Sequence, residues 1–520
     1  MSADGAPSPV LVQALRRQLA AAGETVELIE THISWVLLAG DTAWKIKKPV
    51  RLNFLDFSSL AQRRHFCLEE LRLNRRYAPG VYLDVVAITG TATAPALGGP
   101  GEAIEFALRM RRFAPRALLS EQLADGTLQA AHIDALARRM ASLHLAAERA
   151  PADSPWGGAE MVARQMQALL DPLQALGLEV ADLQAWLLAQ SARLAPLWRQ
   201  RHEQGWVREC HGDLHLHNAV VLPDTVTAFD CIEFEPALRW IDVQSDIAFL
   251  AMDLCAHGRP AWAWRFVNAW LDASGDHGGV PVLRFYMVYR ALVRTLVASL
   301  GGATGSRQQP AAASYLALAR QLALRPPPPQ LWVTHGVSGS GKSFVTQGLL
   351  EALAAVRVRS DVERKCLFGL AALQASAARV PGGIYGRDAT QRTYEQLGVL
   401  AAMLLSAGWP VIVDAACLRR AEREALRAVA NAAGVPCTLL DCQADITTLR
   451  QRIQARLLRA DDPSEADVSV LEHQLTIDEP LTAEEQRSAI VLHTDRPLDM
   501  LALANRCARS GPPRPPAPGA

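Results

Sequence analysis

The segment GVSGSGKS at residues 336–343 constrains this chain more than any other feature. Its glycines, Gly336, Gly339 and Gly341, allow backbone N–H groups to wrap around a phosphate chain at the N-terminus of a helix. The strand-like run LWVTHG precedes the segment and the helical run FVTQGLLEALAA follows it, which is the context that a phosphate-binding P-loop requires. The segment therefore predicts a nucleoside triphosphate site in the C-terminal third of the chain.

Two positions of this P-loop have a defined expected role. Lys342 is expected to reach the β- and γ-phosphates, and Ser343 is expected to offer its hydroxyl to Mg²⁺. A further oxygen ligand for Mg²⁺ is expected at the end of a buried strand, where the run PVIVDA places Asp414. The alternative role for Asp414 is to cap the helix AEREALRAVA, which begins soon after it. The predicted nucleotide-binding residues are Gly336, Val337, Ser338, Gly339, Ser340, Gly341, Lys342 and Ser343.

An acceptor-facing group is expected directly after the strand-like run RVRS, where the chain continues Asp361-Val-Glu-Arg364. This DxxR arrangement resembles P-loop kinases of the polynucleotide kinase, gluconate kinase and zeta-toxin kind. The resemblance implies that Asp361 orients or deprotonates the acceptor hydroxyl and that Arg364 contacts a phosphate. The end of a strand beside a P-loop is a suitable position for a general base. The alternative is a solvated cluster of charges.

Three arginines further along the chain predict a lid over the transferring phosphate. Arg452, Arg456 and Arg459 are spaced i, i+4 and i+7, so they share one face of a helix. Guanidinium groups that close over the phosphates would neutralise the negative charge of the transition state. The alternative is a solvated arginine face without a chemical role.

A second constellation lies in the N-terminal part, in the polar run HGDLHLHN. Asp213 is followed five residues later by Asn218, and twelve residues after Asn218 comes Asp230. In protein kinases a catalytic-loop Asp is followed at the same spacing by an Asn that holds Mg²⁺, and then by a second metal-binding Asp. The run resembles the aminoglycoside phosphotransferase family, a kinase-like fold of small-molecule kinases that includes choline and homoserine kinases. The resemblance implies that Asp213 positions or deprotonates the acceptor hydroxyl, while Asn218 and Asp230 coordinate Mg²⁺.

The same fold requires a strand lysine and a helix glutamate to hold the α- and β-phosphates. Lys45 in AWKIKKP and Glu70 in CLEELRLN are the predicted pair. Strand alternation places Lys45 and Lys47 on one face, so Lys47 stays an alternative to Lys45. Glu69 likewise stays an alternative to Glu70. The chain departs from the pattern of protein kinases before WVLLAG, where it reads ETHIS and carries no GxGxxG.

Two other groups of side chains in this part are expected to be structural. The histidines of HGDLHLHN, His211, His215 and His217, lack partners at zinc-binding spacing and are expected to form hydrogen bonds. Asp242 and Asp246, in RWIDVQSDIAF, match the segment that supports the catalytic loop in the family.

Composition excludes several classes of protein. Lys and Arg (53) balance Asp and Glu (53), so no global field draws the chain to nucleic acid or to an acidic membrane. The nine cysteines include no CxxC pair, which disfavours a disulfide framework and a zinc knuckle and favours the reducing cytosol. No apolar run is long enough to span a membrane, and the N-terminus does not have the pattern of a signal peptide. We therefore expect a cytoplasmic protein without membrane partners.

The expected fold class is an α+β protein-kinase-like (aminoglycoside phosphotransferase) fold followed by an α/β P-loop NTPase with a parallel sheet. Strand-like and helical runs alternate after residue 330, and the prolines of RPPPPQ favour a stiff spacer before them. The predicted organisation is an N-terminal extension (1–24), a kinase-like domain (25–324), a Pro-rich linker (325–330), a P-loop kinase-like domain (331–505) and a disordered tail (506–520).

The two constellations together resemble the bacterial family of bifunctional aminoglycoside phosphotransferase/ATP-binding proteins, which join such a kinase domain to a P-loop kinase or AAA-type ATPase domain. The resemblance implies an ATP- and Mg²⁺-dependent transfer of a γ-phosphoryl group to a hydroxyl of a small molecule at two nucleotide sites. A second hypothesis has only one catalytic domain, with the other an ATP-binding regulatory module. A third has a polynucleotide 5′-hydroxyl kinase in the C-terminal domain. The balanced charge and the absence of interleaved aromatic and basic residues count against the third hypothesis. The choice between ATP and GTP, the acceptor and the oligomeric state stay open.

Overall fold

A computed structural model describes residues 9–52, 55–301, 310–374, 376, 384, 386–459 and 462–509. The chain divides into two compact units. The first comprises Met1–His257 with Phe285–Ala319, and the second comprises Gly258–Arg284 with Arg320–Ala520. All nine cysteines are free. No helix in the described ranges is both long enough and apolar enough to cross a membrane.

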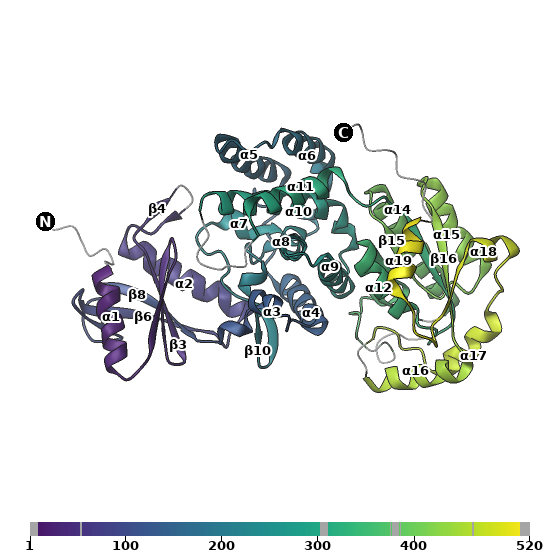
Figure 1. The fold of residues 1–520 in the computed structure, drawn as a ribbon, viewed down its shortest axis with the longest axis horizontal. Helices are drawn as coiled ribbons and strands as arrows, with labels where there is room; N and C mark the ends of the chain where they lie inside the picture. Colours follow the sequence, from purple (N-terminus) through teal and green to yellow (C-terminus); the bar gives the residue numbers. More distant parts are fainter. Residues whose placement is uncertain are drawn as a thin grey trace. The chain divides into compact units, whose positions relative to one another are not determined.

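The first unit begins with an antiparallel sheet (Figure 1). Its strands in spatial order are β1 (Val26–Glu30), β2 (Ser34–Ala39), β3 (Thr42–Lys47), β8 (Glu105–Arg111), β6 (Tyr82–Thr91) and β7 (Ala94–Leu97). The two strands expected in SWVLLAGDTAWKIKKP are β2 and β3, which form an antiparallel pair across the turn at Gly40. Gly40 adopts φ +51°, a conformation that glycine reaches without strain.

Two helices flank this sheet. Within the predicted extension, α1 (Pro9–Ala21) buries Leu11 and Leu15 against Trp35 and Ile46 of the sheet. The predicted helix around residue 70 is α2 (Leu60–Tyr77), which begins at a capping box formed by Ser59 and Gln62. The short strands β4 (Arg51–Leu52) and β5 (Leu55–Asp56) precede it.

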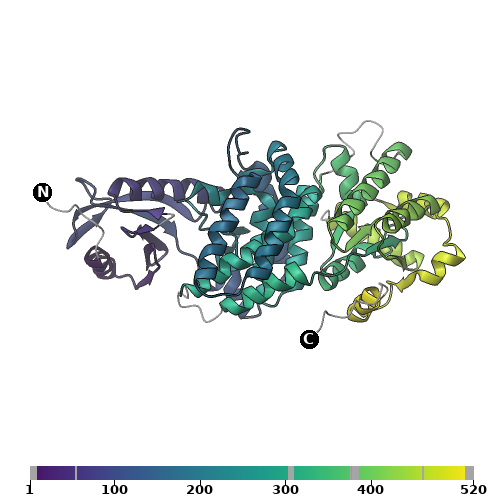
Figure 2. The same ribbon diagram turned by 90° about the horizontal axis from the view of Figure 1, so that it is seen from above.

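Helices dominate the rest of the chain up to residue 324. In chain order they are η1 (Pro115–Ala117), α3 (Leu119–Ala124), α4 (Ala130–Ala146), α5 (Ala159–Ala175), α6 (Ala181–Glu203), η2 (Leu216–Asn218), α7 (Pro236–Arg239), α8 (Val243–Ala256), α9 (Pro260–Ser274), η3 (His277–Gly279), α10 (Val280–Ser299) and α11 (Ala312–Leu324). Helices α5 and α6 pack against each other, as the view in Figure 2 shows. The polar run HGDLHLHN lies between two small antiparallel pairs of strands. They are β9 (Val207–Glu209) with β12 (Trp240–Asp242), and β10 (Ala219–Leu222) with β11 (Thr225–Ala228).

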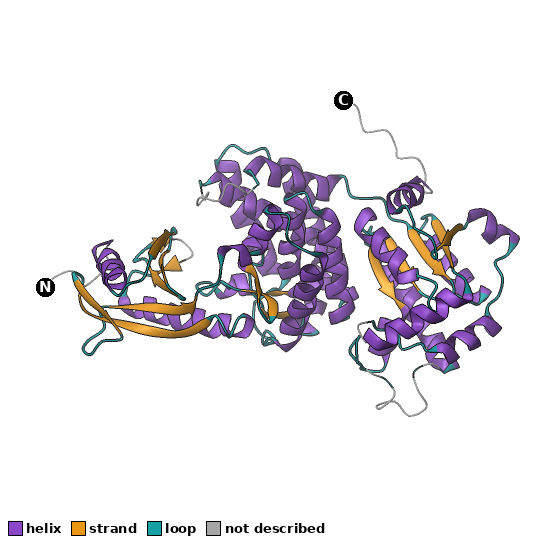
Figure 3. Cartoon of the chain, turned by 60° about the horizontal axis from the view of Figure 1, so that its bottom comes forward, coloured by secondary structure: helices purple, strands orange, loops and turns teal. Residues whose placement is uncertain are grey.

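The second unit contains a parallel sheet, as the alternating pattern predicted. Its strands in spatial order are β14 (Val356–Arg359), β15 (Val411–Asp414), β13 (Leu331–His335), β16 (Cys437–Gln443) and β17 (Ile490–His493). Figure 3 shows helices around these strands. They are α12 (Lys342–Leu353), α13 (Ser360–Leu367), α14 (Arg387–Ser406), α15 (Arg420–Ala432), α16 (Ile446–Arg459), α17 (Val468–Ile477), α18 (Ala483–Ser488) and α19 (Met500–Arg509). Of the predicted tail, residues 506–509 belong to α19, and residues 510–520 lie outside the described residues.

Candidate active sites

The P-loop connects β13 to α12 in the second unit. Gly339 and Gly341 both adopt φ +83°. A Cβ atom at Gly339 would lie 2.8 Å from the carbonyl oxygen of Leu449, so both the conformation and the space require glycine. Lys342 folds back over the loop, and its Nζ donates to the carbonyl oxygens of Gly336 at 2.8 Å and of Val337 at 2.9 Å. Burial lowers the pKa of Lys342.

A cavity of about 680 Å³ opens beside this loop. It is lined by P-loop residues together with charged side chains from other segments of the unit. The charged residues named by the sequence patterns that line it are Lys342, Asp361, Arg364, Asp414, Arg452 and Arg456. The fold therefore gathers around one space groups that are separated by more than a hundred residues in the sequence.

Asp414 ends β15 and lines this cavity together with Ser343. Its Oδ2 accepts a hydrogen bond from Thr346 Oγ1 at 3.0 Å. The helix that Asp414 was alternatively expected to cap, α15, has Arg419 at its N-cap position. The side chain of Asp414 thus faces the P-loop rather than the following helix.

Asp361 and Arg364 lie on α13, directly after the edge strand β14. Arg364 is buried, and its Nη1 donates at 3.1 Å both to the carbonyl oxygen of Ile384 and to Thr390 Oγ1. Both side chains line the cavity, so this run is not a solvated charge cluster.

The predicted lid lies on α16. Arg452 donates through Nη1 to the carbonyl oxygen of Gly339 at 3.1 Å and through Nη2 to that of Thr494 at 2.6 Å. Arg456 donates to the carbonyl oxygen of Ala466 at 2.7 Å. The side chain of Arg459 lies outside the described residues. Arg452 therefore braces the P-loop, and both arginines face the cavity.

The sequence patterns missed several residues that line the cavity. Gln474 accepts a hydrogen bond from the backbone N–H of Ser338 at 2.7 Å, and Tyr394 Oη accepts one from the N–H of Cys417 at 2.9 Å. Neither belongs to a motif. Arg359 had a signal, because two arginines in a strand of four buried positions, Val356–Arg359, are unusual.

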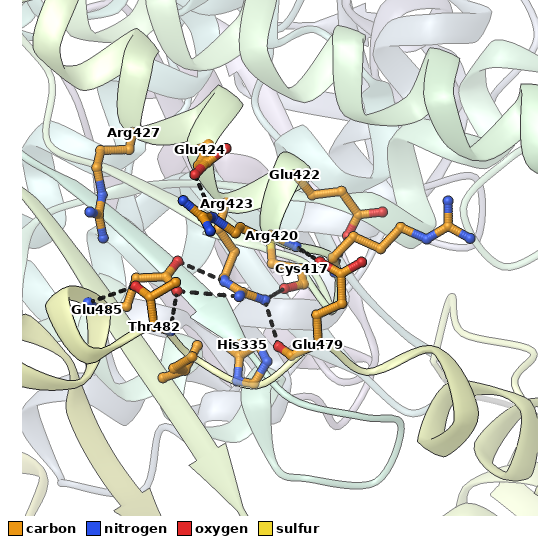
Figure 4. A network of polar contacts seen from close by, with 12 residues as sticks. His335, Cys417, Arg420, Glu422, Arg423, Glu424, Arg427, Glu479, Thr482 and Glu485 are labelled. Atoms are coloured by element: carbon orange, nitrogen blue, oxygen red, sulfur yellow. Dashed lines mark hydrogen bonds and ion pairs between the residues drawn. The ribbon is translucent and has the colours of Figure 1, made fainter.

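A buried arginine fixes the loop that follows Asp414. Figure 4 shows Arg423 of α15 donating to Glu485 and to the carbonyl oxygen of Glu479. Arg423 Nη1 also donates to the carbonyl oxygens of Cys417 at 3.2 Å and Leu418 at 3.0 Å. Cys417 has φ +47°, an unusual conformation for a residue with a side chain. The guanidinium therefore links the loop at Cys417 and Leu418, which follows β15, to the segment that contains Glu479 and Glu485.

Replacing Arg423 by alanine is expected to lower the free energy of unfolding of the second unit by about 3–5 kcal/mol, because it leaves the Glu485 carboxylate buried without its partner. The side chains of Arg423 and Glu485 are 2% and 4% exposed. The matched control is Arg427→Ala, one turn further along α15. Its ion pair with Glu484 is exposed, so the expected change is below about 1 kcal/mol. Urea unfolding followed by tryptophan fluorescence measures both changes, and equal losses would contradict the assignment.

The same pair predicts a pH dependence. Burial opposes ionisation of Glu485, but hydrogen bonding to Arg423 outweighs it and the pKa of Glu485 falls to about 2. The ordinary value of 4.5 applies to the unfolded chain, so this contribution to stability is complete above pH 4.5 and is lost as the pH falls towards 2. In Arg423→Ala the free energy of unfolding should fall less than in the parent as the pH is lowered from 4.5 towards 2. An unchanged acid profile would contradict it.

In the first unit, the predicted lysine and glutamate form an ion pair. Lys45 Nζ lies 2.7 Å from Glu70 Oε1 and 2.7 Å from Asp230 Oδ1. Lys47 also contacts Glu70, at 2.7 Å from Oε2, and its Nζ pairs with Glu233. Burial opposes ionisation of Glu70, but the two lysines lower its pKa to about 2. One buried carboxylate thus holds both candidate lysines.

Exposure and partners separate these alternatives. The side chain of Lys45 is 13% exposed and contacts Asp230, whereas that of Lys47 is fully buried between carboxylates. Glu69 pairs instead with Arg72 and Arg239 on the other side of the helix. The geometry therefore favours Lys45 with Glu70 as the phosphate-facing pair.

The run HGDLHLHN forms a compact polar loop. Asn218 Nδ2 donates at 3.0 Å to both the carbonyl oxygen and Oδ2 of Asp213. His215 Nε2 lies 3.3 Å from the same carboxylate oxygen. Burial would raise the pKa of Asp213, but His215 outweighs it and holds the pKa below its ordinary value. Asp213 is therefore an ionised acceptor of hydrogen bonds at neutral pH.

Asp246 supports this loop from α8, as expected. Its two oxygens accept hydrogen bonds from the backbone N–H groups of His211 at 3.0 Å and Gly212 at 2.9 Å. Asp242 caps α8 through the N–H of Gln244. His211 Nε2 contacts the carbonyl oxygen of Phe229, directly before Asp230, at 2.8 Å.

The histidines of this loop do not form a metal cluster within the described residues. The only group there whose spacing could hold a metal ion combines buried His144, Cys210 and Asp246. Because Asp246 already accepts two backbone hydrogen bonds and contacts His144 Nε2 at 3.0 Å, its arrangement is that of a structural support.

Comparisons with known proteins find a separate family match in each part of the chain. Residues 58–286 match a family model described as "Phosphotransferase enzyme family", and residues 331–481 match one described as "AAA domain". An uncharacterized protein of Mycobacterium tuberculosis is 28% identical over 446 residues, which cover 83% of this chain and 86% of that protein.

Solved structures also show similarity to each part. A choline/ethanolamine kinase family protein from Mesorhizobium loti is 15% identical, with a TM-score of 0.37, over 61% of this chain and 96% of that chain. A gluconokinase from Sinorhizobium meliloti is 24% identical, with a TM-score of 0.26, over 36% of this chain and 96% of that chain.

The match over residues 58–286 gives phosphotransfer as the general activity and kinase as the class of enzyme. The chain therefore combines a region that matches the model of the phosphotransferase enzyme family, over residues 58–286, with a P-loop region that matches the model of an AAA domain, over residues 331–481.

Proposed function

We propose that this chain is an ATP- and Mg²⁺-dependent phosphotransferase with two nucleotide sites, each of which transfers a γ-phosphoryl group to a hydroxyl of a small molecule. One observation carries the proposal. Each unit contains a lysine, two side chains with oxygen atoms of the kind that Mg²⁺ prefers, and an aspartate that could face a hydroxyl.

In the first unit, Lys45 would bind the α- and β-phosphates, with Glu70 fixing its position. Asp213 would accept a hydrogen bond from the acceptor hydroxyl and orient its oxygen towards the γ-phosphate. Its lowered pKa keeps the carboxylate ionised at neutral pH. A carboxylate with so low a pKa is a weak base, so orientation contributes more than early proton removal.

The residues present fit Mg²⁺ in both units, since this ion prefers carboxylate and other oxygen ligands. In the first unit, Asn218 uses its Nδ2 to bind Asp213, which leaves its amide oxygen for a metal beside the half-exposed Asp230 carboxylate. In the second unit, the Ser343 hydroxyl and the Asp414 carboxylate line the same cavity. Bound Mg²⁺ would neutralise the charge that develops on the phosphates.

In the second unit, the backbone N–H groups of the P-loop and Lys342 would hold the phosphates. Asp361 would face the acceptor hydroxyl from the start of α13, and Arg364, Arg452 and Arg456 would offset the negative charge around it. Arg452 already contacts the carbonyl oxygen of Gly339, so it would also keep the loop in its phosphate-binding shape.

A library of small alcohols, sugars and other metabolites with γ-labelled ATP tests this proposal on the full chain. We expect label on at least one hydroxyl compound, dependent on Mg²⁺ and lost in the variant that combines Lys342→Ala with Asp213→Asn. Labelled inorganic phosphate as the sole product would overturn it. Labelled 5′-hydroxyl oligonucleotides in a parallel reaction would point to a polynucleotide kinase instead.

A further inference from the structure

The edge of the parallel sheet in the second unit is covered by a segment from far upstream in the sequence. Strand β14 lies at this edge, and α9 and η3 of the same unit lie against it. Asn268 donates to the carbonyl oxygen of Ala355 at 3.0 Å and accepts from the N–H of Arg357 at 2.7 Å. His277 Nε2 contacts the carbonyl oxygen of Arg357 at 3.2 Å. These side chains form hydrogen bonds that a neighbouring strand would otherwise form with the backbone N–H and C=O groups of the edge strand β14.

The same segment supplies a carboxylate to the two arginines of β14. Asp272 Oδ2 lies 3.0 Å from Arg357 Nη2 and 3.7 Å from Arg359 Nη1. Oδ1 of Asp272 is buried and has no hydrogen-bond partner among the described residues. A buried carboxylate of this kind is retained at a cost, which a role at a nearby site would offset.

Arg359 links this carboxylate to the P-loop. It is 8% exposed and lines the cavity. Its Nη2 lies 3.5 Å from Ser343 Oγ and 3.1 Å from Asp462 Oδ2, and its Nε lies 3.8 Å from Asp414 Oδ2. The guanidinium therefore stands beside the P-loop serine, where a bound triphosphate would bring its β- and γ-phosphates.

We propose that Arg359 is a catalytic residue of the P-loop site that contacts the γ-phosphate, and that Asp272 is its positioning residue. The inference rests on the proposed function of this site. Asp414 and Asp462 line the cavity, so phosphate oxygens can replace them as partners of Arg359. Asp272 does not line the cavity, so its ion pair with Arg359 persists when ligand enters. A guanidinium held from behind in this way loses little freedom on binding phosphate.

Asp272 comes from a segment far upstream of the P-loop in the sequence. Residue 272 lies inside the range that matches the phosphotransferase family model, 58–286, yet it belongs to the compact unit of the P-loop. The P-loop site would therefore depend on a segment that precedes the Pro-rich linker. A fragment that begins at residue 325 would lack both Asp272 and the cover of the sheet edge.

Nucleotide binding by the full chain tests the inference. All variants carry Lys45→Met, which weakens the first nucleotide site, and calorimetry measures the affinity for MgATP and MgADP. In this background, Arg359→Gln should weaken MgATP binding about 10- to 100-fold and MgADP binding less than about threefold, because the missing contact is to the γ-phosphate. Arg359→Lys should recover part of the loss, since it keeps the charge without the planar fork.

The positioning role has its own readout. Asp272→Asn should weaken MgATP binding about 3- to 10-fold, with no further loss when it is combined with Arg359→Gln. The matched control is Glu351→Gln, which breaks another ion pair of α9, at 2.8 Å between Arg265 and Glu351 of α12, and should leave both affinities unchanged.

Three outcomes would overturn the inference. If Arg359→Gln weakened the binding of MgATP and MgADP equally, Arg359 would not contact the γ-phosphate. If the losses of MgATP affinity from Asp272→Asn and Arg359→Gln added up in the double variant, Asp272 would not act through Arg359. If Lys342→Ala does not alter MgATP binding in the Lys45→Met background, the proposed function of this site fails, and the proposed role of Arg359 fails with it.

Discussion

Replacing Lys342 by alanine is expected to lower phosphoryl transfer by the P-loop unit about 100- to 1,000-fold, because the phosphates lose a buried cation where negative charge develops. The lysine already lies in the loop, and its Nζ contacts the carbonyl oxygens of Gly336 and Val337. Its lowered pKa arises from burial, which a bound triphosphate would counteract by supplying negative charge. Turnover of γ-labelled ATP by the full chain measures the loss.

The reaction of the first unit is the internal control for Lys342→Ala. Its lysine, glutamate and aspartates all lie in the other compact unit, so its rate should stay within about twofold of the parent rate. If the P-loop reaction of Lys342→Ala retained more than about a third of the parent rate, the assignment of Lys342 as a phosphate ligand would be wrong.

Replacing Asp213 by asparagine is expected to lower the kcat of the first unit about 100- to 10,000-fold while the KM for ATP changes little. The substitution keeps the shape of the side chain but removes the charged acceptor that Asn218 and His215 surround. It touches the acceptor side of the site, whereas Lys45 and Asp230 on the nucleotide side stay in place.

The pH profile adds a second readout to this variant. The pKa of Asp213 lies below its ordinary value, so its carboxylate stays ionised across the neutral range. Titration of Asp213 should therefore cause no rise in the kcat of the parent between about pH 5 and 8. The control Asp224→Asn changes an exposed aspartate in the turn between β10 and β11 and should leave kcat unchanged. A raised KM for ATP with normal kcat in Asp213→Asn would contradict the assigned role.

Local patterns predicted the elements that carry both sites. The turn at Gly40 and the five parallel strands follow from alternation, short apolar runs and glycine punctuation, which act over a few residues. The P-loop is similarly local, since Gly339 is required by its own φ and by one close carbonyl oxygen.

Contacts between distant segments could not be read in this way. Periodicity left Lys45 and Lys47 equivalent, and only the fold shows that both reach Glu70 while Lys45 alone contacts Asp230. The residues Gln474 and Tyr394 carry no motif because each acts through one hydrogen bond to a backbone N–H far away in the sequence.

The composition break at RPPPPQ likewise said nothing about residues 258–284. The side chains of Asn268 and Asp272 suit an ordinary amphipathic helix, and their partners in β14 lie more than 80 residues away. A pattern in one segment does not specify which sheet edge it will cover.

The chain, as we propose, has two separate phosphotransfer centres. The most direct measurement compares turnover of each labelled acceptor by the full chain, by Lys342→Ala, by Asp213→Asn and by the double variant. We predict that each single variant removes the products of one centre and leaves those of the other, and that the double variant removes both. If both single variants abolish turnover of the same acceptor, independent catalysis at two sites is contradicted.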